Sequence, residues 1–126
     1  MKILLDTHIL LWWLEDAPSL SAAAREILTD AENTIFVSAV SLWEIWLKQS
    51  LGKLRLPLDF TERLAAESFE SLPLTSAQTR QVSLLPWRHR DPFDRMLIAQ
   101  AQVEKLVLLT SDEVLAGYSP VVHLAR

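Results

Sequence analysis

The chain has 126 residues, enough for one folded domain with its own hydrophobic core. Half of the residues are hydrophobic and 22% are charged, so an intrinsically disordered chain is excluded. The lack of cysteine excludes a disulfide scaffold and a thiolate zinc site, and the net charge of −4 excludes a uniformly basic nucleic-acid binder. We therefore expect a single domain over residues 1–126.

Strands and helices alternate along the chain. In order, the sequence predicts strand 2–5, helices 7–15 and 19–31, strand 34–38, helices 39–51 and 58–68, strand 69–74, helices 75–85 and 91–104, strand 106–109, helix 111–116 and strand 121–123. The strands are continuous apolar runs, which is typical of a parallel sheet covered on both faces. We predict an α/β protein with three layers, α/β/α, around a short central parallel sheet.

The apolar runs are too short for a membrane span. The longest has six residues, 9–14, whereas a transmembrane helix needs about 20. The N-terminus carries one lysine, and Asp6 interrupts the apolar run that follows, which argues against a signal peptide. We expect a soluble cytoplasmic protein that has no membrane partner.

Two acidic residues stand where ligands bind in a parallel sheet, beyond the carboxyl ends of the strands. Asp6 directly follows the first strand, and Asp112 follows strand 106–109 after Thr110 and Ser111. If these two strands are neighbours, the two carboxylates converge. Each aspartate also has a simpler explanation: Asp6 precedes a predicted helix that its side chain would cap, and Asp112 stands in the first turn of the predicted helix 111–116, where a negative charge is favourable.

Two further acidic residues lie in predicted helices. Glu44 forms a narrow polar stripe with Ser41 and Lys48 on an otherwise apolar helix. The stripe either faces solvent with a Glu44–Lys48 ion pair or lines a polar cleft, and the sequence leaves both open. Asp94 lies in the first turn of a helix that Asp91 caps, which is enough to explain the two acids but not the basic residues Arg88-His89-Arg90 and Arg95 that flank them.

A pocket that gathered these four acids would need a cation, because the carboxylates would otherwise repel one another. Mg²⁺ prefers oxygen ligands and takes one or two protein carboxylates together with waters and phosphate oxygens. Basic residues cluster in two stretches, which either bind phosphates or form ordinary surface: Lys48, Lys53, Arg55 and Arg63, then Arg80, Arg88, Arg90 and Arg95 with His89 among them. The combination favours phosphodiester hydrolysis.

Four segments, taken together and in this order, resemble one known family. They are Leu4-Leu5-Asp6-Thr7-His8, Ser41-Leu42-Trp43-Glu44-Ile45, Asp91-Pro92-Phe93-Asp94-Arg95 with Ile98-Ala99-Gln100-Ala101, and Thr110-Ser111-Asp112. Over residues 3–118 the chain is similar to PIN-domain proteins, and among them to the VapC-type toxins of bacterial toxin–antitoxin pairs. The resemblance implies a Mg²⁺- or Mn²⁺-dependent endoribonuclease on an α/β/α fold.

The resemblance also implies roles for individual residues. The implied catalytic and metal-binding acids are Asp6, Glu44, Asp94 and Asp112, and the supporting polar residues are Thr7, Ser41 and Thr110. As contacts to RNA phosphates we predict Arg88, Arg90, Arg95 and Lys48. The implied partners are an RNA substrate, a small antitoxin that inserts a segment toward the site, and a second copy in a homodimer.

Two other functions compete with this interpretation. A non-catalytic PIN-like module would bind RNA or regulate, but binding alone does not need four converging acids. A phosphotransfer receiver domain would have an acidic pair after the first strand, where this chain has Asp6 and Thr7. Among the remaining residues, we expect His8 to be structural. Most of the five tryptophans are expected in the core, the alternative being an interface or a platform for bases.

Overall fold

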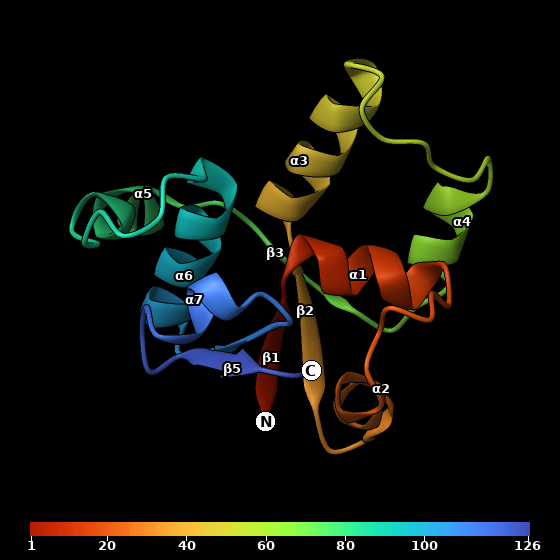
Figure 1. Ribbon diagram of the computed structural model, residues 1–126, viewed down its shortest axis with the longest axis horizontal. Coiled ribbons are helices and arrows are strands. Elements are labelled where there is room, and N and C mark those ends of the chain that lie inside the picture. Colours follow the sequence, from red (N-terminus) through yellow and green to blue (C-terminus); the bar gives the residue numbers. More distant parts are fainter.

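The computed structural model describes residues 1–126 and contains one five-stranded sheet. Its strands are β1 (Lys2–Leu5), β2 (Thr34–Ser38), β3 (Glu70–Leu72), β4 (Val107–Thr110) and β5 (Val122–Leu124). All neighbouring strands are parallel, in the order β3-β2-β1-β4-β5. The central strand is therefore β1, between β2 and β4 (Figure 1), and the predicted parallel sheet is confirmed.

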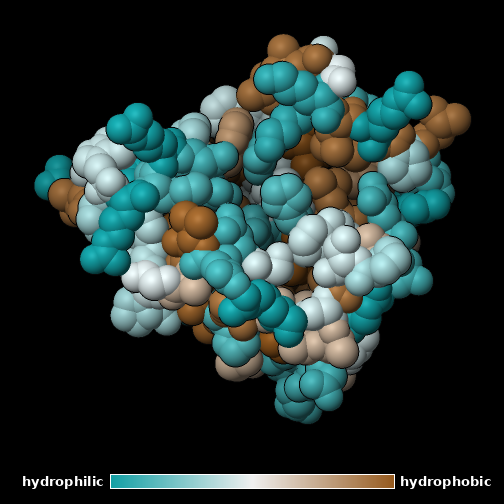
Figure 2. All heavy atoms as spheres, viewed as in Figure 1, coloured by the Kyte–Doolittle hydropathy of each residue, from teal (hydrophilic) through white to brown (hydrophobic).

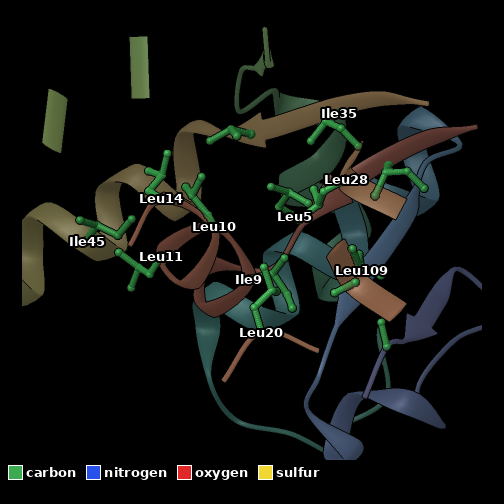
Figure 3. Packing of buried hydrophobic residues seen from close by; sticks show 14 of the residues in the cluster. Leu5, Ile9, Leu10, Leu11, Leu14, Leu20, Leu28, Ile35, Ile45 and Leu109 are labelled. Carbon is green, nitrogen blue, oxygen red and sulfur yellow. The ribbon is translucent and has the colours of Figure 1, made fainter. Parts of the chain in front are cut away.

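Alternate side chains of the central strand face opposite layers of helices. Ile3 and Leu5 pack in one core with α1 (Thr7–Leu14), α2 (Ala22–Thr29) and Phe60, the first residue of α4 (Phe60–Ala65). Leu4 packs in a second core with α6 (Pro92–Glu104) and α7 (Glu113–Ala116), while α5 (Ser76–Ser83) packs against α6. Figure 3 shows the first core, where Leu5 lies close to side chains of α1. The sheet thus has a helical layer on each side, as predicted.

Several elements differ at their ends from the prediction. The helix expected from Ser19 begins at Ala22, because the Ser21 hydroxyl accepts a hydrogen bond from the backbone N–H of Ala24 at 3.1 Å. Both α4 and β3 are shorter than expected. No helix has the length and the apolar composition that a membrane crossing requires.

The carboxyl ends of the three central strands lie side by side. Asp6 follows β1, and its backbone N–H donates to the carbonyl of Leu109 in β4 at 3.0 Å. The helix α3 (Ala39–Ser50) begins directly after β2 and packs against both α1 and α6. The predicted site residues of four separate segments are therefore carried to one edge of the sheet.

Candidate active site

Asp6 is buried at the carboxyl end of β1, and its side chain faces β4. Its Oδ2 accepts a hydrogen bond of 2.7 Å from the Thr110 hydroxyl. Although Asp6 occupies the N-cap position of α1, its side chain makes no capping hydrogen bond. Capping, one of the two roles that the sequence allowed, is therefore not what this carboxylate does.

The environment of Asp6 disfavours its negative charge. Burial raises the pKa of Asp6, and the negative charge of Glu44 raises it further. The hydrogen bond from Thr110 and the positive charge that His8 can carry act in the opposite direction but do not cancel the effect of burial. A carboxylate held in this way is stabilised by a neighbouring cation.

Glu44 extends from α3 toward the same place and is also buried. Its Oε2 accepts a hydrogen bond of 2.6 Å from the Lys48 Nζ, while its Oε1 is buried without any hydrogen-bond partner. Next to it, the Ser41 hydroxyl accepts a buried hydrogen bond of 3.0 Å from the Thr7 hydroxyl, which connects α3 to α1. Glu44 and Lys48 of the polar stripe therefore line a cleft, and the stripe does not simply face solvent, although the Glu44–Lys48 ion pair is present.

Asp94 approaches from the first turn of α6. Its Oδ2 lies 2.8 Å from the Nε2 of His89, and its side chain is 18% exposed. Burial raises the pKa of Asp94 to about 6, and the negative charges of Asp6 and Asp91 contribute to the rise despite the hydrogen bond with His89. The sequence placed His89 only within a basic stretch and did not identify it as the partner of Asp94.

Asp6 interacts electrostatically with both Glu44 and Asp94, whereas Asp112 is not among the charges that shift the pKa of Asp6 or Asp94. Glu44 raises the pKa of Asp6, and Asp6 raises that of Asp94. The Asp112 carboxylate instead caps α7 by accepting a hydrogen bond from the Val114 N–H at 2.9 Å. Its backbone N–H donates to the Thr110 hydroxyl, which in turn donates to Asp6. Asp112 is thus linked to the other three acids through Thr110.

The donor set fits a hard divalent cation that keeps most of its waters. No three histidine, aspartate or glutamate side chains stand close enough together to ligate one ion. Mg²⁺ is usually bound through only one or two protein carboxylates. The unpartnered Glu44 Oε1 and the raised pKa values of Asp6 and Asp94 mark negative groups whose charge the protein itself leaves incompletely compensated.

The prediction that Arg95 contacts an RNA phosphate is wrong. Its guanidinium is buried and donates to the backbone carbonyls of the segment before α6, including that of Pro86 at 2.9 Å, and to the Tyr118 hydroxyl at 2.7 Å. The Trp87 ring covers it, with 3.9 Å from the guanidinium carbon to the ring centroid. Arg95 therefore holds a loop in place. Its guanidinium is buried and already hydrogen-bonded, so it is not available to a phosphate.

The other predicted phosphate contacts are accessible. Arg88 and Arg90 are exposed in the segment between α5 and α6, and one Nη of Arg88 donates to the Gly117 carbonyl at 3.1 Å. Lys48 is partly exposed while it pairs with Glu44. These three residues keep their predicted role as candidates.

Comparison with known proteins places this geometry in a family. Residues 3–119 match the PIN domain. The chain belongs to the PIN-domain family. Ribonuclease VapC22 from Mycobacterium tuberculosis is 29% identical in an alignment of 119 residues that covers 92% of this chain and 91% of that protein. The family predicted from the sequence is thereby confirmed.

Solved structures of low sequence identity share the fold. VapBC2 from Rickettsia felis, bound to a promoter DNA fragment, matches with a TM-score of 0.72 at 19% identity, covering 99% of this chain and 98% of that one. A toxin–antitoxin complex from Klebsiella pneumoniae matches with a TM-score of 0.65 at 21% identity, covering 96% and 95%. At these identities the likeness supports the fold of the PIN domain, which agrees with the predicted α/β/α class.

Most tryptophans of this PIN domain are not in its core, contrary to expectation. Trp43, Trp46 and Trp87 are 59%, 41% and 77% exposed, while Trp12 and Trp13 are only partly buried. Trp43 packs edge-on against Phe93 of α6, with ring centroids 5.0 Å apart. Figure 2 shows hydrophobic atoms on the surface over α3 and the segment that follows it.

A cavity of about 280 Å³ lies between α1 and α3 beside the acids. Glu44 and Thr7 contribute to its wall, so it adjoins the site described above. His8, expected to be structural, is exposed and lines this cavity together with Trp12. The His8 side chain is therefore not part of the core, because α1 turns it outward.

Proposed function

We propose that this PIN domain is a metal-dependent endoribonuclease and acts as the toxin of a toxin–antitoxin pair. The observation that carries the proposal is the set of carboxylates of Asp6, Glu44 and Asp94 near the carboxyl ends of the central strands: Asp6 and Glu44 are buried and Asp94 is 18% exposed, and the negative charge of Glu44 raises the pKa of Asp6 while that of Asp6 raises the pKa of Asp94. The similarity to a protein named as a ribonuclease, and to the VapBC and toxin–antitoxin complexes, supports the substrate class and the antitoxin partner. Mg²⁺ is the proposed metal, with Mn²⁺ as its substitute.

Asp6 and Asp94 would hold the cation. Both carboxylates are oriented by a partner on another segment: the Thr110 hydroxyl fixes Asp6, and the His89 imidazole fixes Asp94. Fixed ligands lose little freedom when the ion binds, which favours binding. A bound divalent cation supplies a Lewis acid for a phosphoryl oxygen and lowers the pKa of a bound water.

Glu44 would orient the attacking water. Its Oε1 has no protein partner, so it can accept a hydrogen bond, while Lys48 holds the other oxygen in position. The water oxygen would attack phosphorus in line while its proton passes to the Glu44 carboxylate, and the bond from phosphorus to the departing ribose oxygen would break, with solvent supplying the proton to that oxygen. Asp112 is the fourth proposed acid, and Thr7 and Ser41 keep α1 and α3 in register.

The exposed cations would bind the RNA on either side of the broken bond. Arg88 and Arg90 lie in the segment that leads into α6, close in sequence to Asp94. Their exposure leaves guanidinium donors available for phosphate oxygens. A homodimer in the cytoplasm, inhibited by an antitoxin segment that reaches the acids, completes the proposal.

The test is cleavage of a pool of structured RNAs, tRNA included, by protein freed of any copurifying partner. We expect discrete fragments with Mg²⁺ or Mn²⁺ and none with EDTA. Asp6→Asn should abolish cleavage and leave the circular dichroism spectrum unchanged, whereas Glu26→Gln, which neutralises an exposed acid on α2, should cleave normally. Equal cleavage by Asp6→Asn would refute the proposed site, and the lack of both cleavage and metal binding would favour the non-catalytic module.

A further inference from the structure

The cavity between α1 and α3 has the composition of a site for one nucleotide. Its volume of about 280 Å³ lies near the lower limit of ligand pockets, about 300 Å³. It can therefore take one nucleoside or one large side chain but not a helix. Since Glu44 is shared between the cavity and the acidic site, an occupant of the cavity would lie next to the reacting phosphate.

One wall of the cavity is aromatic. His8 and Trp12 are one helical turn apart on α1, and their rings lie 5.8 Å apart between centroids with an angle of 36° between their planes. Both line the cavity, and His8 is exposed. Proteins that bind single-stranded nucleic acids stack bases on such aromatic faces, and the stacking tolerates any base.

The cavity also has one cation that is free to bind a phosphate. Two ammonium groups, those of Lys48 and Lys53, and two carboxylates, those of Glu15 and Glu44, line it, and Lys48 is paired with Glu44 at 2.6 Å. Lys53 is exposed and forms no ion pair, and it follows the end of α3. Aromatic wall and free cation are the two elements of a single-strand binding groove.

We propose that this cavity binds the unpaired nucleoside adjacent to the scissile phosphate, with its base against Trp12 and His8 and its outer phosphate on Lys53. The inference rests on the proposed ribonuclease function and adds to it a specific demand on the substrate, an unstacked nucleotide beside the cleaved bond. Regular duplex RNA would then be cut poorly, because its bases are not available to the cavity.

The first experiment compares RNA affinity and cleavage for variants of the cavity. Asp6→Asn protein allows binding of a labelled single-stranded RNA to be measured by fluorescence anisotropy without cleavage. In this background we expect Trp12→Leu to weaken binding about 5- to 100-fold and Trp12→Phe to retain most of it. Lys53→Ala should weaken binding and reduce the slope of log affinity against log salt by about 0.7, the value for one phosphate contact.

Matched controls separate these effects from changes in folding or total charge. Lys2→Ala removes one exposed lysine at the opposite, amino end of β1 and should leave the affinity and salt slope unchanged. Trp13→Leu replaces the neighbouring indole, which lies outside the cavity and donates to Glu67 at 3.0 Å. It should leave RNA affinity unchanged even if it lowers the melting temperature.

A second experiment locates the base directly. Asp6→Asn protein is irradiated with RNA carrying 4-thiouridine at single positions around the bond that the wild type cuts, and crosslinked peptides are identified. We expect the crosslink from a nucleotide next to that bond to map to residues 7–15.

The outcomes distinguish failure of the inference from failure of the proposed function. If the wild type cleaves in an Asp6-dependent manner but cavity variants keep their RNA affinity and KM, the inference is wrong and the function stands. The same conclusion follows if the variants lose only a protein partner, because the cavity then receives a protein side chain. If the wild type neither binds nor cleaves RNA, both proposals fall.

Discussion

The acidic site should make the metal-free protein less stable at neutral pH than it would be with one carboxylate fewer. Burial and the neighbouring charges raise the pKa of Asp94 from the usual 3.8 to about 6. Folding therefore favours the neutral carboxyl, and the stability that this group contributes is complete below pH 3.8. It is lost as the pH rises through about 6, where the folded protein has to accept the charge.

The size of the effect follows from the pKa. Moving a carboxyl pKa from 3.8 to about 6 corresponds to roughly 3 kcal/mol between the two protonation states. Solvent and salt screen part of this, because the Asp94 side chain is 18% exposed, and about 1–2 kcal/mol remains. Asp94→Asn removes the charge while its amide oxygen can still accept the hydrogen bond from His89.

We expect Asp94→Asn to be more stable than the wild type by about 1–2 kcal/mol at pH 7.5 in EDTA, or by roughly 4–8 °C in melting temperature. At pH 4 the two proteins should be nearly equal. Urea unfolding followed by tryptophan fluorescence at pH 4, 5, 6 and 7.5 measures the difference. Glu26→Gln, at an exposed position, provides the control and should show no such pH dependence.

Added metal should reverse this difference, so that the wild type becomes more stable than Asp94→Asn. Mn²⁺ should bind the folded wild type and stabilise it in proportion to the logarithm of the metal concentration, while Asp94→Asn should gain far less. If Asp94→Asn is less stable than the wild type at pH 7.5 in EDTA, or if the difference does not depend on pH, Asp94 is not held in a charge-disfavouring site. The electrostatic coupling of the acids would then have to be abandoned.

Two further variants test single contacts. His89→Ala should weaken Mn²⁺ binding about 10- to 100-fold in calorimetric titration. His89→Asn can still donate a hydrogen bond to Asp94 and should lose less affinity. If His89→Ala binds Mn²⁺ as tightly as the wild type, His89 does not orient Asp94. Arg95→Met should destabilise the fold by about 2–4 kcal/mol in urea unfolding, because several buried carbonyls lose a charged donor; a stability change below about 0.5 kcal/mol would show that the loop does not depend on Arg95.

Most of the fold was predictable because its strands are short runs dominated by apolar residues. Continuous apolar runs such as residues 2–5 and 34–38 have no polar alternation, so a parallel sheet covered on both sides was the natural prediction. The placement of Asp6 followed from the rule that ligands bind beyond the carboxyl ends of parallel strands. Its proximity to Thr110 then depended on one further fact, that β1 and β4 are neighbours, which only the structure supplies.

The sequence could not reveal which charged residues are used in hydrogen bonds within the fold and are therefore not available to a ligand. Arg95 sits in a basic stretch, and nothing local indicates that the carbonyls of Val82, Leu85 and Pro86 would surround it. The signal that could have suggested caution is its position in a helix of apolar residues, one turn before Ala99 in the core. Asp112 is a similar case: the sequence allowed it a place in the first turn of a helix, and in the structure its carboxylate caps α7.

The exposed tryptophans were missed because residue type predicts their burial poorly. Trp is large and amphipathic, so it is common both in cores and at binding surfaces. Trp46 illustrates the difficulty: it packs edge-on against the buried Phe60, at 5.5 Å between ring centroids, and is still 41% exposed. Helical periodicity alone cannot decide between these situations when α3 is apolar on several sides.

The arrangement of Asp6, Glu44 and Asp94 links metal binding to the stability of the fold. Each carboxylate is held by one partner: Thr110 for Asp6, Lys48 for Glu44 and His89 for Asp94. One partner orients a carboxylate but does not fully offset the negative charges of Asp6 and Asp94, as their raised pKa values indicate. The remaining compensation has to come from outside the chain. A divalent cation that supplies it would therefore both stabilise the fold and complete the site, and the residues that favour metal binding are those that make the metal-free protein weakest.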